Sequence, residues 1–176
     1  MRKLKNSELN RKTVAQYKEA AKSPIVVVLD NIRSLNNIGS VFRTGDCLLV
    51  EKVVLCGISA TPPHKDIHKT ALGATESVEW TYYESSIDAV NDLRKEGYII
   101  AGIEQVEDSI HLQDFEPESG KKYAIIFGHE VKGISQEVID ICDICLEIPQ
   151  FGTKHSFNIS VSAGIVTWEI FRKLNP

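Results

Sequence analysis

Pro24-Ile-Val-Val-Val-Leu-Asp30 is the stretch that decides the fold. Its centre, Ile25 to Leu29, is an unbroken apolar run without the polar alternation of a half-exposed strand. Runs of this kind are typical of strands buried on both faces, as in parallel sheets. Polar residues from Asp30 to Asn36 then lead into apolar residues at helical spacing, which predicts a strand, a loop and a helix in succession.

The same succession repeats along the rest of the chain. Further strands are expected over residues 53–56, 78–82, 98–103, 123–127 and 145–148. Helices are expected over residues 38–49, 87–95, 135–141 and 158–174, with a short one near 65–69, whereas residues 105–121 look irregular. Strands that alternate with helices predict an α/β fold with a mostly parallel sheet flanked by helices.

Length and composition are those of an ordinary globular protein. The chain has 176 residues, of which 43% are hydrophobic and 25% are charged, which suits one domain with its own core. No apolar run approaches the roughly 18 residues that a membrane helix needs. The polar, basic N-terminus is unlike a secretory signal, so we expect a cytoplasmic protein that does not enter a membrane.

Charge divides the chain into two parts. Residues 1–22 carry seven Lys or Arg, including Arg11 and Lys12, against two Glu, which gives this segment a charge of +5 and leaves −9 for residues 23–176. We interpret residues 1–22 as a basic helical arm, with its helix over 7–22, and residues 23–176 as the folded domain. An arm that contacts nucleic-acid phosphates and a merely solvated terminal helix both fit this pattern.

One cysteine pair has a spacing that metal and redox sites use. Cys142-Asp-Ile-Cys145 could form half of a zinc site, but no second CxxC or His pair supplies the other ligands. We therefore predict inert, buried thiols and no metal.

The two standard phosphate-binding turns are absent. The first strand is followed by Asp30-Asn-Ile-Arg-Ser-Leu-Asn36 and not by GxGxxG, and Gly120-Lys121 is followed by Lys122 and not by Ser or Thr. A nucleotide-like cofactor would have to be bound in another way.

A first polar motif, Asn31-x-Arg33…Asn36-Asn37-x-Gly39-x-x-x-Arg43-Thr44, follows the first strand. Ligands of α/β proteins bind at this end of the sheet. The amides and the guanidinium suit a phosphate and a ribose. A helix cap with one surface arginine would explain the same residues.

A second motif, Phe127-Gly128-His129-Glu130-Val131-Lys132-Gly133, places a carboxylate between two glycines after a buried strand. Glycines permit tight turns and close approach of the backbone, so Glu130 would meet a hydrogen-bond donor or an arginine. A plain turn with an exposed Glu130 fits as well. We interpret His129 as incidental, although its ordinary pKa would suit a general base.

A third motif, Ile148-Pro149-Gln150-Phe151-Gly152…Ser156-Phe157-Asn158-Ile159-Ser160, joins the last strand to the last helix. Asn158 or Ser156 could simply cap that helix. A cap does not explain the further small residues Ser160, Ser162 and Gly164, which indicate close packing against a ligand loop or a partner helix.

Together, the three motifs resemble those of the SpoU/TrmH branch of the SPOUT methyltransferases. The family elements N-x-G-x-x-x-R-T, G-x-E-x-x-G and I-P-x-x-G…S-L-N-V-S match this chain in order from about Ile25 to Arg172. Phe157 stands where Leu is usual and Gln150 where Met is common. The sequence around Glu96-Gly-Tyr98 also resembles that of the catalytic domains of tRNA guanosine 2′-O-methyltransferases.

The resemblance implies a C-terminal trefoil knot, a homodimer, S-adenosyl-L-methionine (AdoMet) as cofactor, and methylation of a ribose 2′-hydroxyl of RNA. The implied cofactor-binding residues are Glu104, Gly128, Gly133, Ile148, Gln150, Phe157 and Asn158. The implied catalytic set is Arg43, Asn37, Glu130, Ser156 and Asn158. RNA contacts are expected at Arg33, Arg43, Arg11, Lys12 and Arg172.

Proposals for the family make the arginine at the position of Arg43 a base. Free arginine titrates above about 12, so we expect Arg43 to bind a phosphate and orient the ribose, with the proton acceptor unassigned. Arg172 follows Asn158 by 14 positions, about 21 Å along a helix, and would be structural or serve a partner's site.

Other functions remain open from the sequence. The short arm favours tRNA over rRNA as substrate, with an rRNA 2′-O-methyltransferase as the alternative. An RNA-binding module without catalysis keeps the same fold, and so does a structural α/β oligomer.

Overall fold

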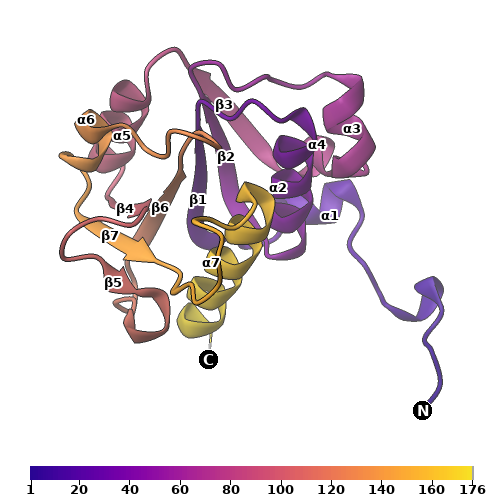
Figure 1. Ribbon diagram of the computed structural model, residues 1–176. Coiled ribbons are helices and arrows are strands. Elements are labelled where there is room, and N and C mark those ends of the chain that lie inside the picture. Colours follow the sequence, from indigo (N-terminus) through magenta and orange to yellow (C-terminus); the bar gives the residue numbers. More distant parts are fainter. Residues whose placement is uncertain (176) are drawn as a thin grey trace.

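The computed structural model describes residues 1–175 and confirms the α/β fold (Figure 1). One seven-stranded sheet runs in the order β3-β2-β1-β6-β4-β7-β5, and all of its strand pairs are parallel. The strands are β1 Ser23–Asp30, β2 Val50–Cys56, β3 Glu79–Tyr83, β4 Tyr98–Ile103, β5 Ile110–His111, β6 Lys122–Phe127 and β7 Ile144–Glu147.

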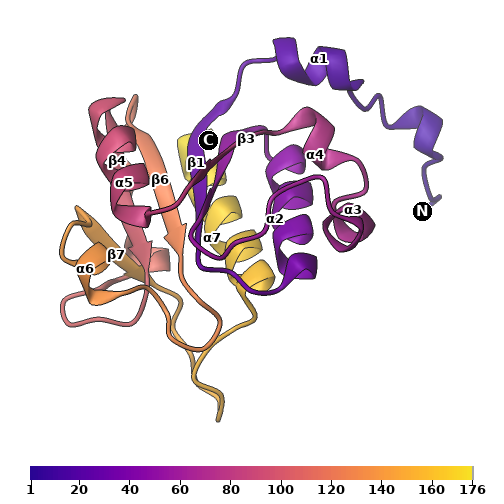
Figure 2. The same cartoon turned by 90° about the horizontal axis from the view of Figure 1, so that it is seen from above.

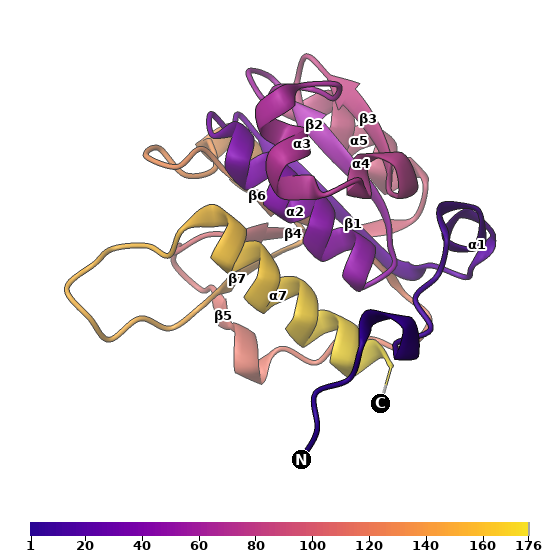
Figure 3. The same cartoon turned by 90° about the vertical axis from the view of Figure 1, so that its right-hand side faces the viewer.

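Helices cover both faces of the sheet, as Figure 2 shows for α2 and α7 on one face and α5 and α6 on the other. The α-helices are α1 Val14–Glu19, α2 Leu35–Cys47, α3 Lys65–Ala71, α4 Ala74–Ser77, α5 Ser86–Lys95, α6 Gln136–Ile139 and α7 Ile159–Leu174. Two short 3-10 helices, η1 Asn6–Glu8 and η2 Leu112–Asp114, complete the set. Helix α7 runs beside α2 (Figure 3).

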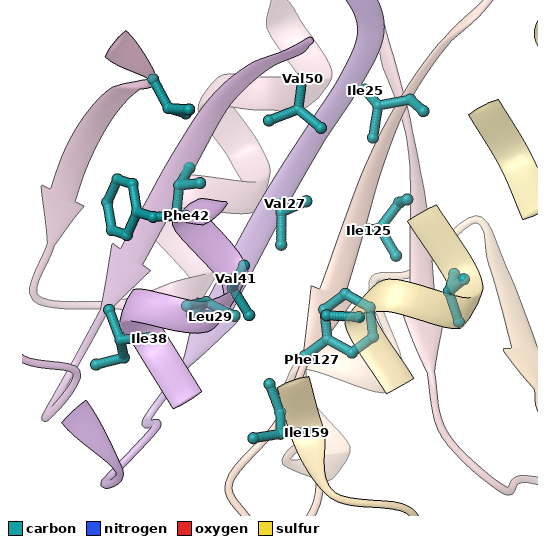
Figure 4. Close-up of a cluster of buried hydrophobic side chains, with 14 of the residues drawn as sticks. Ile25, Val27, Leu29, Ile38, Val41, Phe42, Val50, Ile125, Phe127 and Ile159 are labelled. Atoms are coloured by element: carbon teal, nitrogen blue, oxygen red, sulfur yellow. The ribbon is translucent and has the colours of Figure 1, made fainter. Parts of the chain in front are cut away.

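The apolar run at residues 25–29 is buried on both faces, as its sequence predicts. Ile25, Val27 and Leu29 point into a core cluster with α2 and α7 (Figure 4), whereas Val26 and Val28 point into a second cluster with α5. Strand β1 therefore lies in the interior of the sheet, between β2 and β6, where both sets of its side chains have apolar cover.

The polar motifs follow the carboxyl ends of three strands of the one sheet. The first motif follows β1, the second follows β6, which pairs with β1, and the third follows β7. Parallel strands end at the same edge of a sheet, so the three loops meet there.

The N-terminal helix is shorter than expected over residues 7–22. The α-helix spans only Val14–Glu19, because a capping box of Thr13 and Gln16 starts it and Ala20 ends it in an extended conformation. Tyr17 is buried, and its hydroxyl donates to the carbonyl oxygens of Gly45 and Val50 at 3.4 Å. The second half of the arm thus packs on the body, and the division at residue 22 stays a prediction.

Residues 105–121 are less irregular than expected. They contain the short strand β5 and the helix η2, and Leu112 and Phe115 are buried. Strand β5 has only two residues, too few for a periodic pattern in the sequence. The trefoil knot also stays a prediction, with which the parallel sheet is compatible. Within residues 1–175, the helices fall short of the length and apolar character required to cross a membrane.

Candidate active site

A cleft of about 650 Å³ opens where the loops after β4, β6 and β7 meet. A side pocket of about 120 Å³ shares Glu104 and Ser156 with it and extends toward β7. Each residue that the sequence resemblance assigns to the cofactor lines the cleft or the side pocket: Glu104, Gly128, Gly133, Ile148, Gln150, Phe157 and Asn158.

The turn from Gly128 to Gly133 forms one wall of the cleft, and its geometry requires both glycines. His129 and Gly133 exchange backbone hydrogen bonds of 3.1 and 2.8 Å, so the turn closes tightly. A Cβ at Gly128 would overlap the backbone of Gly133. Gly133 has a φ of +67°, and a Cβ there would overlap the Glu104 carboxylate.

His129 has a local role in this turn. Its Nδ1 accepts hydrogen bonds from the backbone N–H groups of Val131 at 3.0 Å and Lys132 at 3.2 Å. These contacts occupy the nitrogen that a base would need, which agrees with the interpretation of His129 as incidental to chemistry.

Glu130 joins the second motif to the first. Its Oε2 accepts from the backbone N–H of Arg33 at 3.1 Å, and its Oε1 accepts from that of Ser34 at 2.9 Å. Burial acts to raise the pKa of Glu130, but these backbone hydrogen bonds outweigh it and lower the pKa. Glu130 is therefore an ionised acceptor that holds the start of α2 against the cleft.

Asn37 joins all three motifs. Its Nδ2 donates to Oε1 of Glu130 at 3.4 Å, and its Oδ1 accepts from Nδ2 of Asn158 at 3.2 Å. Ser34, the N-cap of α2, accepts from the backbone N–H of Asn37 at 3.3 Å. The side chain is only 9% exposed, so both ends of its amide are satisfied by residues 93 and 121 positions away.

Asn158 is also the N-cap of α7. Its Oδ1 accepts from the backbone N–H of Ser160 at 2.9 Å and from the Ser160 hydroxyl at 2.6 Å. The cap expected from the sequence and the link to Asn37 thus use opposite ends of one amide.

Glu104 connects two walls of the cleft. Its Oε2 accepts from the backbone N–H of Ile134 at 3.0 Å, and its Oε1 accepts from that of Gln105 at 3.1 Å. The carboxylate therefore fixes the loop after β4 against the Gly128–Gly133 turn.

The other predicted residues are more scattered. Ser156 is exposed and lines the cleft. Arg43 is exposed on α2 and does not line the cleft. Arg172 forms a bidentate ion pair with Glu169 on α7, and Arg11 and Lys12 line a separate pocket beside α1. The structure thus brings together the cofactor set with Glu130, Ser156 and Asn158, and leaves the arginines outside.

Two contacts of the site were missed from the sequence. The backbone N–H of Ser34 donates to Glu130, and the Ser34 side chain caps α2. Its place before an apolar helix could have indicated the cap. Gln105 donates to the carbonyl oxygen of His155 at 3.5 Å, and no local pattern predicts this contact.

The cysteine pair is less buried than the sequence predicts. Cys142 and Cys145 are free, half-buried thiols, and burial raises the pKa of Cys142 to about 12. A thiol with a raised pKa is a poor nucleophile and metal ligand. Among residues 1–175, three or more His, Cys, Asp or Glu side chains nowhere gather in a metal-binding arrangement.

The parallel sheet and its three-loop cleft place the chain in a class of α/β proteins whose solved members include RNA methyltransferases. An AdoMet-bound rRNA methyltransferase from Sinorhizobium meliloti superposes with a TM-score of 0.81 at 21% identity, over 90% of this chain and 60% of that one. A structure concerned with the 2-OH methylation of C/U34 on tRNA gives 0.76 at 21% identity, over 87% of this chain and 99% of that one.

Sequence comparison shows the family to which the chain belongs. The chain belongs to the SpoU rRNA Methylase family, whose model matches residues 24–168. A Staphylococcus saprophyticus protein assigned to the TrmH family of tRNA/rRNA methyltransferases is 31% identical over 162 residues. That match covers 92% of this chain but 64% of the relative, so the chain spans somewhat less than two thirds of the length of this relative.

Proposed function

We propose that this chain transfers a methyl group from AdoMet to a ribose 2′-hydroxyl of RNA, with tRNA favoured over rRNA. The observation that carries the proposal is the hydrogen-bonded set Glu130–Asn37–Asn158 at the edge of the cleft. This set links the three family motifs through one buried amide.

The cleft is suited to AdoMet. Its volume of about 650 Å³ lies within the range of roughly 300–1,000 Å³ that small-ligand sites occupy. The Glu104 carboxylate and the backbone of the tight turn line it, which fits a cofactor with a cationic sulfonium and amino group. AdoMet, when bound, supplies an activated methyl group.

The residues around the cleft act by positioning. Asn37 and Asn158 fix the start of α2 and the start of α7 relative to each other, and Glu130 holds the loop that carries Arg33. Ser156 contacts substrate or cofactor within the cleft, and Arg43 binds the adjoining phosphate from α2. Positioning of reactants alone can account for several kcal/mol of a barrier, on the order of 7–11.

Glu130 is poorly suited to accept the proton of the 2′-hydroxyl. Its oxygens accept from two backbone N–H groups and from Asn37, and its pKa is lowered. A group with a lowered pKa is a weak base near neutral pH. The proton acceptor therefore stays unassigned, and Glu130 acts as a positioning residue.

The RNA is held by basic residues around the cleft and on the arm. The backbone N–H of Arg33 donates to Glu130, which lines the cleft, and Arg11 and Lys12 belong to the basic segment 1–22. The solved relative concerned with 2-OH methylation on tRNA supports both the ribose hydroxyl and tRNA. The relative assigned to tRNA/rRNA methyltransferases keeps rRNA as the alternative substrate.

The working unit is a cytoplasmic homodimer. Val161 and Trp168 are exposed apolar side chains on α7, and a second copy would cover them. Arg172 lies on the same helix and is paired with Glu169. It either holds this surface of α7 in place or contacts the active site of the partner. Analytical ultracentrifugation at micromolar concentration tests this, since a monomer would refute it.

Radiolabelled AdoMet incubated with size-separated RNA tests the proposed reaction. We expect label in the tRNA fraction, and label in rRNA alone would select the alternative. AdoMet binding by calorimetry without transfer to any RNA would leave the proposal without support and favour a binding module. A matched reaction with Asn158→Asp should lose the label.

A further inference from the structure

We propose that the loops at residues 128–133 and 150–157 hold an unpaired nucleotide that neighbours the methylated one. Phe151 stacks on its base, and Lys132 and Lys154 contact its phosphates. The inference rests on the proposed function, because it assigns the substrate class of the same cleft.

The loop before α7 carries an aromatic ring that the fold does not use. Phe151 is 96% exposed, and the neighbouring Lys154 and His155 are exposed as well. Figure 3 shows this loop projecting from the body ahead of α7. A fully exposed phenylalanine gains nothing from folding, and its neighbour Gln150 lines the side pocket of the cleft, so the ring is available to a ligand that extends out of the cleft.

The opposite wall presents the same pair of side-chain types. Val131 is 82% exposed at the tip of the Gly128–Gly133 turn, and Lys132 beside it is exposed. Residues 128–133 line the cleft on this side, and His155, Ser156 and Phe157 line it from the other loop. The loop that carries Phe151 and Lys154 therefore borders the same opening as Val131 and Lys132.

The charged residues around the cleft indicate along which side an anionic strand would lie. The carboxylate of Glu130 is turned inward to the backbone N–H groups of Arg33 and Ser34, so Lys132 is the charge that its turn presents outward. Residues 150–157 contain Lys154 and no acidic residue. The loop after β4 is acidic, with Glu104, Glu107 and Asp108, so an anionic strand would lie along the side of the two lysines.

The ring selects unpaired RNA. Bases inside an A-form helix are stacked on one another, and their faces are closed to a protein side chain. Bases in loops, bulges and ends can turn out and stack on an aromatic ring, a contact that tolerates any base identity. A ribose that must enter a cleft between two loops also has to leave a regular helix.

Fluorescence anisotropy with a labelled hairpin RNA separates this proposal from the chemistry. Phe151→Ala is expected to raise the Kd for the hairpin about tenfold, whereas Phe151→Tyr keeps the ring and the wild-type Kd. A fully paired duplex of the same length should bind with the same Kd to all three proteins. Leu72→Ala, which shortens another exposed apolar side chain outside the cleft, serves as the control.

The salt dependence tests the lysines. Loss of one phosphate contact to a single strand lowers the slope of log K against log salt by about 0.7, which we expect for Lys154→Ala and for Lys132→Ala. Lys121→Ala removes an exposed lysine at the amino end of β6, away from the cleft, and should leave the slope unchanged.

Three outcomes would overturn the proposal. The first is an unchanged hairpin Kd for Phe151→Ala. The second is a raised AdoMet Kd of that variant with an unchanged hairpin Kd. The third is a changed oligomeric state of that variant with an unchanged hairpin Kd. The second outcome would make the loop a cover of the cofactor, and the third would make it a contact between copies. If the wild-type protein binds the hairpin through Phe151 but methylates no RNA, the proposed function fails, and only the contact between Phe151 and an unpaired base stands.

Discussion

Asn158 donates a hydrogen bond from Nδ2 to Oδ1 of Asn37 across 3.2 Å, although 121 positions separate the two residues. The orientations of the two amides, and so the donor and the acceptor of this bond, are fixed by their other partners. Glu130 is an acceptor only, so the Asn37 NH2 group must face it, and the Asn37 oxygen is left for Asn158. The Asn158 oxygen then receives the backbone N–H of Ser160.

Asn158→Asp separates this link from the helix cap. Aspartate keeps the oxygen that caps α7 and is a good N-cap residue, but it cannot donate to Asn37. We expect a loss of methyl transfer of at least about tenfold, measured with labelled AdoMet and tRNA, and a melting temperature lowered by a few degrees, because the buried Asn37 oxygen loses its donor. Retained activity with the same stability would show that the link is unimportant.

Glu130→Gln tests the lowered pKa of Glu130. A carboxylate whose folded-state pKa is lowered stabilises the fold above its unfolded pKa of about 4.3, and this contribution is lost as pH falls through the folded pKa. We expect the free energy of unfolding of the wild type to exceed that of Glu130→Gln by about 1–2 kcal/mol at pH 7 and the difference to be smaller at about pH 4, below the unfolded pKa. Urea titrations at both pH values measure it, and a difference that is independent of pH would contradict the assignment.

Gly128→Ala tests the tight turn. The added methyl group would overlap the backbone of Gly133, which cannot move without opening the turn. We expect the AdoMet Kd to rise by at least about tenfold, a cost of about 1.4 kcal/mol. Gly152→Ala is the matched control, because a Cβ there meets nothing within 4 Å. Equal calorimetric Kd values for the two variants would argue against the turn as cofactor wall.

Arg43→Lys tests the role of the exposed arginine on α2. Lysine keeps the charge but loses the bidentate grip on a phosphate. We therefore expect kcat/KM for RNA to fall about tenfold or more with the AdoMet Kd unchanged. Arg94→Lys, on α5 at the other face of the sheet, should leave kcat/KM as it is. Near wild-type turnover of Arg43→Lys would exclude the phosphate clamp.

Much of the fold could be predicted from residues that act locally. The apolar run from Ile25 to Leu29 and the helical spacing after Asn158 needed no distant partner, and both elements formed as expected. The arm helix was overextended because its apolar spacing is weak and the capping box at Thr13 decides its start. Strand β5 was not predicted, because its two residues pair with β7 through the backbone and leave no side-chain pattern in the sequence.

The residues that form the site were easier to predict than the hydrogen bonds between them. The glycines, Glu130 and Asn158 could be named from motif order, since each motif follows a strand. The partners of Glu130 could not, because Arg33 and Ser34 contribute their backbone N–H groups, which every residue type except proline carries. The distance of Arg43 from the cleft lining likewise depends on how α2 packs against α3 and α7.

The most direct test of the central claim is to map the methyl group. RNA labelled by this protein with AdoMet is digested with alkali and, separately, to nucleosides for mass spectrometry. We predict an alkali-resistant dinucleotide at one position and a 2′-O-methylated nucleoside, because a methylated 2′-oxygen cannot attack the adjacent phosphate. Label on a base, with every linkage open to alkali, would contradict the account.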